Sequence, residues 1–575
     1  MTLAEINNLV QKAFKAAERG NTHTARKNLV KALRLDPNND SVHNALGLLY
    51  LDTADYAKAS QHFSRAVSLA PDNVFAINNY GVALSLSGDF ETAITQLRRA
   101  CTLAPENPAM AFDLANSLVR ASKYEEASSI CAALIGKNID QFMVELTYGQ
   151  AQRLLGQHDN AIVHLQAAQM INPAHPDVMD ELARTYMVSG RAGKALEVID
   201  RALALHPRSA KMHQLKSQIL RLLGQFERAT ASAQTAVVEA PDNHDVKLTF
   251  AVCLLTQGHF TEGWKYYDAR WQTFPSGKIY PIGKKVWRGE KLLGRSLLVR
   301  SEQGVGDEIL FSTCLNKLAE TTRGETVAVE CDRRMYQLFS RTYPSFTFLP
   351  RPAPEKNEPR THGYDVEIGF GSLPSLFYQD IGAILEDTPL PILVDPKNTE
   401  IWADKFAELG PGLKIGVAWR GGVTPIAQRG RSFSLMELMP ILKTHGCHFI
   451  NLQYGDVAEE ITAINSHAGV DLHHYPDVDP MKDMDSQAAQ ISALDLIIQT
   501  SNTSAHLAGA MGGHVWVLQA ASPYWPWFLD RNDMPWYSNV SQFRMSLDED
   551  RSATIKHVAE MLEKYIQSHI DGTND

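Results

Sequence analysis

Cysteine is scarce in this sequence of 575 residues and shows no pairing pattern. No Cys-x-x-Cys pair and no metal-ligand spacing occurs among the six cysteines, which are Cys101, Cys131, Cys253, Cys314, Cys331 and Cys447. A disulfide framework and a cysteine-held metal module are therefore excluded as the basis of the fold, and a reducing compartment is expected.

Long apolar runs and an excess of basic residues are also missing. No stretch reaches 18 consecutive apolar residues, which argues against a membrane-spanning helix. The opening segment MTLAEINNLVQKAFKAAERG lacks the features of a secretion signal and predicts an amphipathic helix. The formal net charge of −10 argues against general nucleic-acid binding, which needs a concentrated basic surface. These absences predict a soluble, cytoplasmic protein of about two to four domains.

The first half of the chain repeats with a period of 34 residues. Prolines mark the repeat at Pro37, Pro71, Pro105, Pro173, Pro207 and Pro241, with Ile139 in the one missing position. Small residues recur ten residues later, at Gly47, Gly81, Ala115, Gly149, Ala183, Ser217 and Ala251, and again at Ala59, Ala93, Ala127, Ala161, Ala195 and Ala229. Small side chains let helices cross closely, and proline ends a helix. The pattern predicts a stack of helical hairpins, each covering its neighbour's apolar face.

These residues resemble tetratricopeptide repeats over residues 6–243, with a degenerate last unit around FTEGWKYYDARW. The resemblance implies an all-α superhelix with a long curved surface for a protein partner. A structural spacer or a dimerisation surface is the alternative.

Asn79 lies where the repeat arm of eukaryotic O-GlcNAc transferases carries an asparagine ladder that binds peptide backbone. The matching positions of other repeats hold Ala45, Asp113, Thr147 and Leu182, so the ladder is not reproduced. From this resemblance we expect Asn79 and Asp113 to contact a protein acceptor in the repeat groove.

After Trp271 the period of 34 residues ends, and short apolar runs alternate with helical segments. Seven strands are predicted, over residues 296–300, 326–330, 366–370, 414–419, 448–453, 494–500 and 514–519. This alternation predicts βαβ units with parallel sheets, and a proline-rich connector near residues 389–400 separates two Rossmann-like lobes. Ligands of such sheets bind at the carboxyl ends of the strands.

The first motif, SLLVRSEQGVGDEILF, is a strand followed by a glycine-bearing turn and a helix. Gly304 and Gly306 allow positive φ and the close approach of a ligand. Two carboxylates, Glu302 and Asp307, lie in this turn, and capping of the following helix is the alternative explanation for Asp307.

The second motif, KIGVAWRGGVTPIAQRGRSFSL, places Arg420, Arg429 and Arg431 between a buried strand and a helix. Arginine side chains match phosphate oxygens in a bidentate manner, which suits a diphosphate. Solvent-exposed charge is the alternative.

The third motif runs from a strand into QTSNTSAHLAGAMGG. Ser501, Asn502 and Thr503 form a hydroxyl-rich loop at a helix N-terminus, which is a site for an anion or a ribose. His506 in the first helical turn is placed to donate a hydrogen bond as a neutral imidazole, or else to pack under the loop.

Five stretches over residues 265–565 resemble the heptosyltransferase-like branch of GT-B glycosyltransferases: EQGVGDEILF, VAWRGG…RGRS, NLQYGD, ALDLII…AHLAGAMGGHVWVL and LDRNDMPWY. The resemblance extends to bacterial proteins that fuse tetratricopeptide repeats to such a module, including flagellin glycosyltransferases. It implies that Asp307 is the general base. Arg431 and its neighbours would bind the donor diphosphate, and the loop 501–506 would bind the donor nucleotide or its phosphates. Gln453 of NLQYGD is a further donor-binding candidate.

The resemblance also implies four segments. They are a repeat array over 1–243, a degenerate repeat and linker over 244–290, an acceptor-side lobe over 291–395 and a donor-side lobe over 396–575. No metal and no cofactor other than the nucleotide-sugar is expected. Heptosyltransferases usually carry an aspartate before the HLAGA-like helix, whereas this chain has QTSNTSAH, which argues against an ADP-heptose donor.

The sequence therefore predicts a metal-independent glycosyltransferase that modifies a protein, O-linked and with flagellin as a candidate acceptor. A glycan-assembling transferase and a non-catalytic scaffold with a decayed transferase lobe are the alternatives. The enzymatic interpretation requires that the turn carrying Asp307 and the loop near Arg431 face each other across a crevice between the two lobes.

Overall fold

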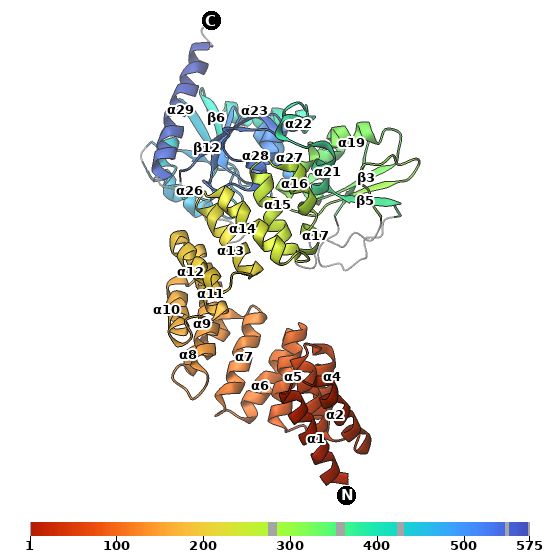
Figure 1. The fold of residues 1–575 in the computed structure, drawn as a ribbon. Coiled ribbons are helices and arrows are strands. Elements are labelled where there is room, and N and C mark those ends of the chain that lie inside the picture. Colours follow the sequence, from red (N-terminus) through yellow and green to blue (C-terminus); the bar gives the residue numbers. More distant parts are fainter. Residues whose placement is uncertain are drawn as a thin grey trace. The chain divides into compact units, whose positions relative to one another are not determined.

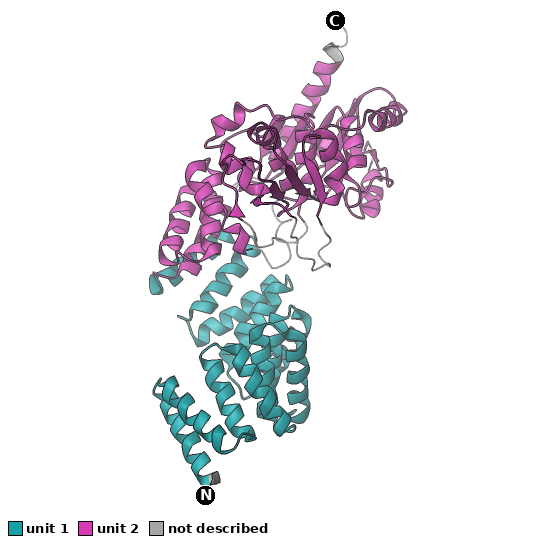
Figure 2. Ribbon diagram, turned by 90° about the vertical axis from the view of Figure 1, so that its right-hand side faces the viewer, with its two compact units in different colours: residues 1–207 teal, residues 208–575 magenta. Residues whose placement is uncertain are grey.

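A computed structural model describes residues 2–273, 285–351, 363–422, 431–467, 469–546 and 551–572. The chain divides into two compact units, unit 1 over residues 1–207 and unit 2 over residues 208–575 (Figure 2).

Unit 1 consists of helical hairpins (Figure 1). Its helices are α1 (Thr2–Glu18), α2 (Thr22–Leu35), α3 (Asp40–Asp52), α4 (Tyr56–Leu69), α5 (Val74–Ser87), α6 (Phe90–Leu103), α7 (Pro108–Arg120), α8 (Tyr124–Leu134), α9 (Gln141–Leu154), α10 (His158–Ile171), α11 (Pro176–Val188) and α12 (Ala192–Leu205). The repeating prolines follow the ends of alternate helices, as at Leu35 before Pro37. The next helix is then capped by an asparagine, because Asn39 Oδ1 accepts from the Val42 amide at 3.1 Å.

The recurring small residues lie at the helix crossings. A Cβ at Gly81 would lie 2.6 Å from Leu97 Cγ, and one at Gly149 would lie 2.5 Å from Leu165 Cγ. No side chain fits at either position without displacing its neighbour. The predicted tetratricopeptide architecture is confirmed.

Unit 2 begins with further helices, α13 (Ala210–Leu222), α14 (Phe226–Glu239), α15 (His244–Thr256), α16 (Phe260–Tyr267) and the short α17 (Arg270–Thr273). Helices α15 and α16 form the degenerate last hairpin. Two sheets follow.

The first sheet contains β1 (Lys285–Val286), β2 (Leu297–Arg300), β3 (Val327–Cys331), β4 (Thr347–Pro350) and β5 (Val366–Gly369). Its order is β1-β5-β2-β3-β4, and its strands pair in parallel. Helices α18 (Val305–Ser312), α19 (Leu315–Thr321), α20 (Tyr336–Thr342), α21 (Leu373–Phe377) and α22 (Ile381–Leu385) accompany it. Because β2 lies between β5 and β3, the strand order reverses beside β2, where ligands of such sheets bind.

The second sheet contains β6 (Leu413–Ala418), β7 (Cys447–Asn451), β8 (Leu472–His473), β9 (Leu496–Thr500), β10 (Val515–Gln519), β11 (Asp533–Met534) and β12 (Tyr537–Arg544). Its order is β11-β12-β10-β9-β6-β7-β8, and only the β11–β12 pair is antiparallel among the described strands. The accompanying helices are α23 (Pro396–Ala407), α25 (Met439–Leu442), α26 (Ala458–Asn465), α27 (Met484–Ser492), α28 (Thr503–Ala510) and α29 (Arg551–Gly572). The strand order reverses between β6 and β9. The α/β prediction for this half of the chain is confirmed.

An aromatic seam joins α16 to the segment that follows β10. The Trp264 ring meets that of Trp525 edge to face, with centroids 5.4 Å apart, and Tyr267 meets Trp525 at 5.7 Å. Phe260 and Phe528 add a third contact at 5.6 Å. The last repeat helix therefore shares one hydrophobic core with both sheets.

Candidate functional site

Three loops meet where the strand orders reverse: the turn after β2, the loop after β6 and the loop after β9. A Cβ at Gly306 would lie 3.4 Å from His506 Cδ2 and 3.5 Å from Thr503 Oγ1. A Cβ at Gly421 would lie 3.1 Å from the Ser501 carbonyl oxygen. Glycine suits this position, because a Cβ at Gly421 would press against the backbone of the loop after β9.

The glycines of the turn after β2 do not have the positive φ that the sequence suggested. Gly304 has a φ of −78°, and Gly306 lies inside the first turn of α18 with an ordinary helical φ. The reason is that the chain enters α18 directly from an extended residue. Gly306 serves close packing against the third loop.

Gln453 supports the loop after β6 through hydrogen bonds to the backbone of that loop. Its Oε1 accepts from the backbone amides of Trp419 at 3.0 Å and of Arg420 at 2.7 Å. Because the side chain is buried and engaged with backbone, it positions the loop.

Asn502 and Thr500 tie the loop after β9 to the loop after β6. Asn502 Nδ2 donates to the Arg420 carbonyl oxygen at 3.3 Å, while its Oδ1 accepts from the Ala505 amide at 3.1 Å and so caps α28. The Thr500 hydroxyl donates to the carbonyl oxygen of Arg431. The two loops therefore form one connected surface with the buried Ser501 between them.

The three arginines of the second motif differ in their surroundings. The Arg420 guanidinium is ion-paired with Glu460, which also accepts from Trp419 Nε1 at 3.0 Å. Arg429 lies outside the described residues. Arg431 is near enough to Asp307 for its positive charge to lower the pKa of that carboxyl group. The charge of Arg431 therefore acts on the turn after β2, whereas the Arg420 guanidinium is engaged with Glu460.

Asp307 caps α18 and is half-buried, with Oδ2 accepting from the Gly304 amide at 3.1 Å. Burial raises the pKa of Asp307 to about 6, and the negative charge of Glu302 acts in the same direction. The Gly304 amide and the charges of Arg431 and Arg270 lower this pKa and only partly offset burial. A carboxyl group that ionises near neutral pH is suited to proton transfer.

His506 is held as a neutral ring beside Gly306, the residue before Asp307. Its Nδ1 lies 3.1 Å from Tyr537 Oη, and its ring centroid lies 5.0 Å from that of Trp527. Burial lowers the pKa of His506 to about 4. A neutral imidazole can offer either a donor or an acceptor to a ligand.

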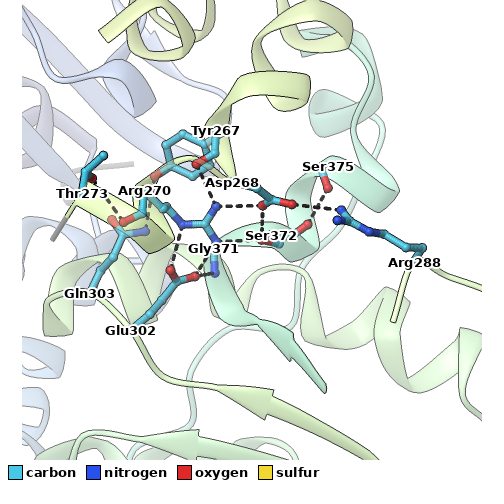
Figure 3. Close-up of polar contacts among 10 residues, drawn as sticks. All are labelled: Tyr267, Asp268, Arg270, Thr273, Arg288, Glu302, Gln303, Gly371, Ser372 and Ser375. Atoms are coloured by element: carbon cyan, nitrogen blue, oxygen red, sulfur yellow. Dashed lines mark hydrogen bonds and ion pairs between the residues drawn. The ribbon is translucent and has the colours of Figure 1, made fainter. Parts of the chain in front are cut away.

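A buried ion pair lies under the turn after β2 (Figure 3). Arg270 of α17 binds the Glu302 carboxylate in a bidentate manner, with Nε–Oε2 at 2.8 Å and Nη2–Oε1 at 2.7 Å. Sequence reasoning missed Arg270, because it lies in the degenerate last repeat, 32 residues before its partner. The one available signal was the buried acid of the turn, which needs a cation.

The predicted acceptor residues lie in unit 1. Asn79 Nδ2 of α5 donates to Asn44 Oδ1 at 3.2 Å. Asp113 of α7 accepts from Asn78 Nδ2 at 2.6 Å, and burial raises the pKa of Asp113. Both side chains are thus partnered within the repeats.

Among the described residues, no group of three or more His, Cys, Asp or Glu side chains is arranged to hold a metal ion. None of the helices in the described ranges has the length and apolarity needed to cross a bilayer.

Comparison with known proteins identifies the repeats. Sequence models of the tetratricopeptide repeat match residues 17–53, 40–73, 81–142 and 153–219. Among solved structures, a tetratricopeptide repeat protein from Parabacteroides merdae has a TM-score of 0.39 at 16% identity, covering 44% of this chain and 99% of that one. The repeat protein TTC0263 of Thermus thermophilus has a TM-score of 0.29 at 21% identity, covering 32% and 99%.

A curated relative matches across both halves of the chain. Protein FlbA of Caulobacter vibrioides is 30% identical over 415 residues, which cover 68% of this chain and 68% of that protein. Together with the repeats, this identity and coverage show that the chain is a tetratricopeptide-repeat protein of the FlbA family.

Proposed function

We propose that the chain is a glycosyltransferase that moves a sugar from a nucleotide-sugar to a hydroxyl group of a protein. The observation that carries this proposal is the convergence of Asp307, Arg431 and the N-terminus of α28 where three strand-to-helix loops meet. The resemblance of these loops to heptosyltransferase-like GT-B enzymes supports the reaction class.

In the proposed reaction the acceptor oxygen attacks the anomeric carbon, and the bond from that carbon to the phosphate oxygen breaks. Asp307 takes the proton of the acceptor hydroxyl. Negative charge then develops on the leaving nucleotide, where the guanidinium of Arg431 and the first amides of α28 would stabilise it. The neutral His506 would donate a hydrogen bond there without adding charge.

The tetratricopeptide repeats support a protein as the acceptor of the sugar. Tetratricopeptide arrays present long surfaces to protein partners. We propose that unit 1 selects the acceptor and that Asn79 and Asp113 lie in its binding groove. Flagellin is the acceptor that the resemblance suggests.

The test compares the purified full chain with Asp307→Asn and with Asp404→Asn, an exposed aspartate on α23, as the matched control. Each is incubated with candidate nucleotide-sugars and whole-cell protein, and modified peptides are found by mass spectrometry. Asp307→Asn is expected to lower transfer about 10²-fold or more, as loss of a general base does, and Asp404→Asn to leave it unchanged. Equal turnover by Asp307→Asn would remove this base, and labelling of free glycans alone would favour a glycan-assembling transferase.

A further inference from the structure

We propose that Arg270 is a positioning residue of the transfer site, which through its bidentate ion pair with Glu302 fixes the turn that carries Asp307 and balances the charge beside it. This inference rests on the proposed function, since it concerns the same carboxyl group.

Every nitrogen of the Arg270 guanidinium is used (Figure 3). Besides the two bonds to Glu302, Nη2 donates to Ser372 Oγ at 2.7 Å, and Nη1 donates to the Tyr267 carbonyl oxygen at 3.2 Å and to Asp268 Oδ1 at 3.1 Å. The side chain is only 1% exposed. Because all its nitrogens are hydrogen-bonded, the planar guanidinium group of Arg270 is held in one orientation.

Glu302 connects the two strands at which the first sheet reverses its order. It belongs to the turn after β2, and its Oε1 also accepts from the Gly371 amide at 2.6 Å, directly after β5. Since Arg270 binds Ser372 in that same segment, the guanidinium holds both carboxyl ends together. The turn that leads to Asp307 is thereby anchored to α17, the short helix that follows the last hairpin.

Close packing surrounds the pair. A Cβ at Gly369 would lie 1.8 Å from Trp271 Cζ2, and one at Gly371 would lie 2.9 Å from Glu302 Oε1. The guanidinium lies over the rings of Tyr267 and Trp271, 4.5 and 4.9 Å from their centroids.

The charges that face Asp307 come from several elements. Glu302 is negative, and Arg270 and Arg431 are positive. Burial keeps the phenols of Tyr267, Tyr524 and Tyr537 neutral by raising the pKa of each, and His506 is neutral. Glu302 raises the pKa of Asp307 and Arg270 lowers it, so the two charges of the ion pair act on the base in opposite directions.

The experiment follows the ionisation of Asp307 in the full chain in two ways. The first is the pH dependence of kcat/KM. The second is carbon-13 NMR of labelled aspartate, with the Asp307 signal assigned by its absence in Asp307→Asn. Arg270→Gln should move the midpoint to higher pH and Glu302→Gln to lower pH, each by about one unit, as loss of a nearby charge does. The double variant should return close to the wild-type midpoint.

Conservative and control variants separate the effect of the ion pair's geometry from the effect of its charges. Arg270→Lys and Glu302→Asp keep the charges but lose the bidentate geometry, so kcat should fall while the midpoint stays. Arg288→Gln is the matched control, because Arg288 joins the same network through Asp268 at 2.9 Å but does not touch Glu302. It should change neither kcat nor the midpoint.

The proposal would be overturned if Arg270→Gln and Glu302→Gln moved the Asp307 midpoint in the same direction. It would also be overturned if both variants lowered activity without moving the midpoint, since the ion pair would then have only a structural role. If Arg270→Gln does not fold, the conservative pair decides, because unchanged kcat in both would also overturn it. If the wild-type chain transfers no sugar, the NMR midpoints still test the charge balance, and the proposed function alone fails.

Discussion

The side chain of Asp307 has two uses that do not exclude each other. It closes the first turn of α18 through the Gly304 amide, and it stands half-buried among neutral rings and opposed charges. Capping fixes where the carboxyl group points, and burial decides at which pH it is charged.

The transfer rate is expected to depend on the ionisation of this group. A base must be deprotonated, and because burial raises the pKa of Asp307 to about 6, kcat/KM should be level above pH 7 and fall as pH decreases through 6. At pH 5 about a tenfold loss is expected, from the tenfold change in the ionised fraction per pH unit. Initial rates measured as a function of pH test this decrease in kcat/KM. Values of kcat/KM that stay level down to pH 5 would contradict the prediction.

The same shift predicts a cost to stability. Between about pH 4 and 6 the folded chain binds this proton more tightly than the unfolded chain, so Asp307 destabilises the fold above pH 6. Asp307→Asn should therefore raise the free energy of unfolding at pH 7.5 by about 1 kcal/mol, a reduced figure because the half-buried group is partly solvated. Denaturant unfolding of this variant and of Asp404→Asn measures the difference, and a destabilised Asp307→Asn would show that its cap contributes more.

The residues that sequence reasoning could find are those whose signal is local. Glycine turns, cap-forming clusters and arginines beside strands are visible in the sequence, and several of them meet in the structure, as Gly306 does with Thr503 and His506. Pairing is not local. Nothing near Arg420 shows that Glu460 engages it, and nothing near Glu302 shows that Arg270 lies beneath it.

At the scale of elements, the helices of the array depend on close crossings, and two glycines provide a matched comparison. A Cβ at Gly149 would meet Leu165 Cγ at 2.5 Å, whereas one at Gly193 in α12 would have nothing within 4 Å. Gly149→Ala should destabilise unit 1 by about 1–3 kcal/mol through overpacking, and Gly193→Ala should stabilise it by about 0.4–1 kcal/mol. Thermal unfolding followed by circular dichroism compares the stability of the two variants. Equal changes in stability would mean that the helices at the Gly149 crossing can move to accommodate the added methyl group.

Helices and strands could be predicted from the sequence where the hydrophobic pattern extends over enough residues to be recognised. The 34-residue period is repeated often enough to define the hairpins, and the seven strands predicted from apolar runs are present with ends within two residues of those expected. The two-residue strands β1, β8 and β11 are too short to show any alternation, so their place in the sheets comes from tertiary pairing.

At the scale of the whole molecule, the structure suggests where the chain can be divided. Unit 2 keeps α13 to α17, and its hydrophobic core includes Trp264 and Tyr267 of α16. A chain of residues 208–575 is expected to be soluble and to unfold cooperatively, whereas one that begins at residue 285 should aggregate because the aromatic seam is exposed. Size-exclusion chromatography of both distinguishes them, and a monodisperse shorter chain would show that α13 to α17 are dispensable.

The aromatic seam also has an optical consequence. All nine tryptophans of the chain follow residue 263, and five of them are buried in the core to which the seam belongs: Trp264, Trp287, Trp525, Trp527 and Trp536. Fluorescence excited at the red edge of the indole band, where tyrosine does not absorb, therefore reports on unit 2 alone. Loss of emission and loss of helical ellipticity on heating will coincide only if the two units melt together, so one unlabelled sample reveals whether they are thermodynamically coupled.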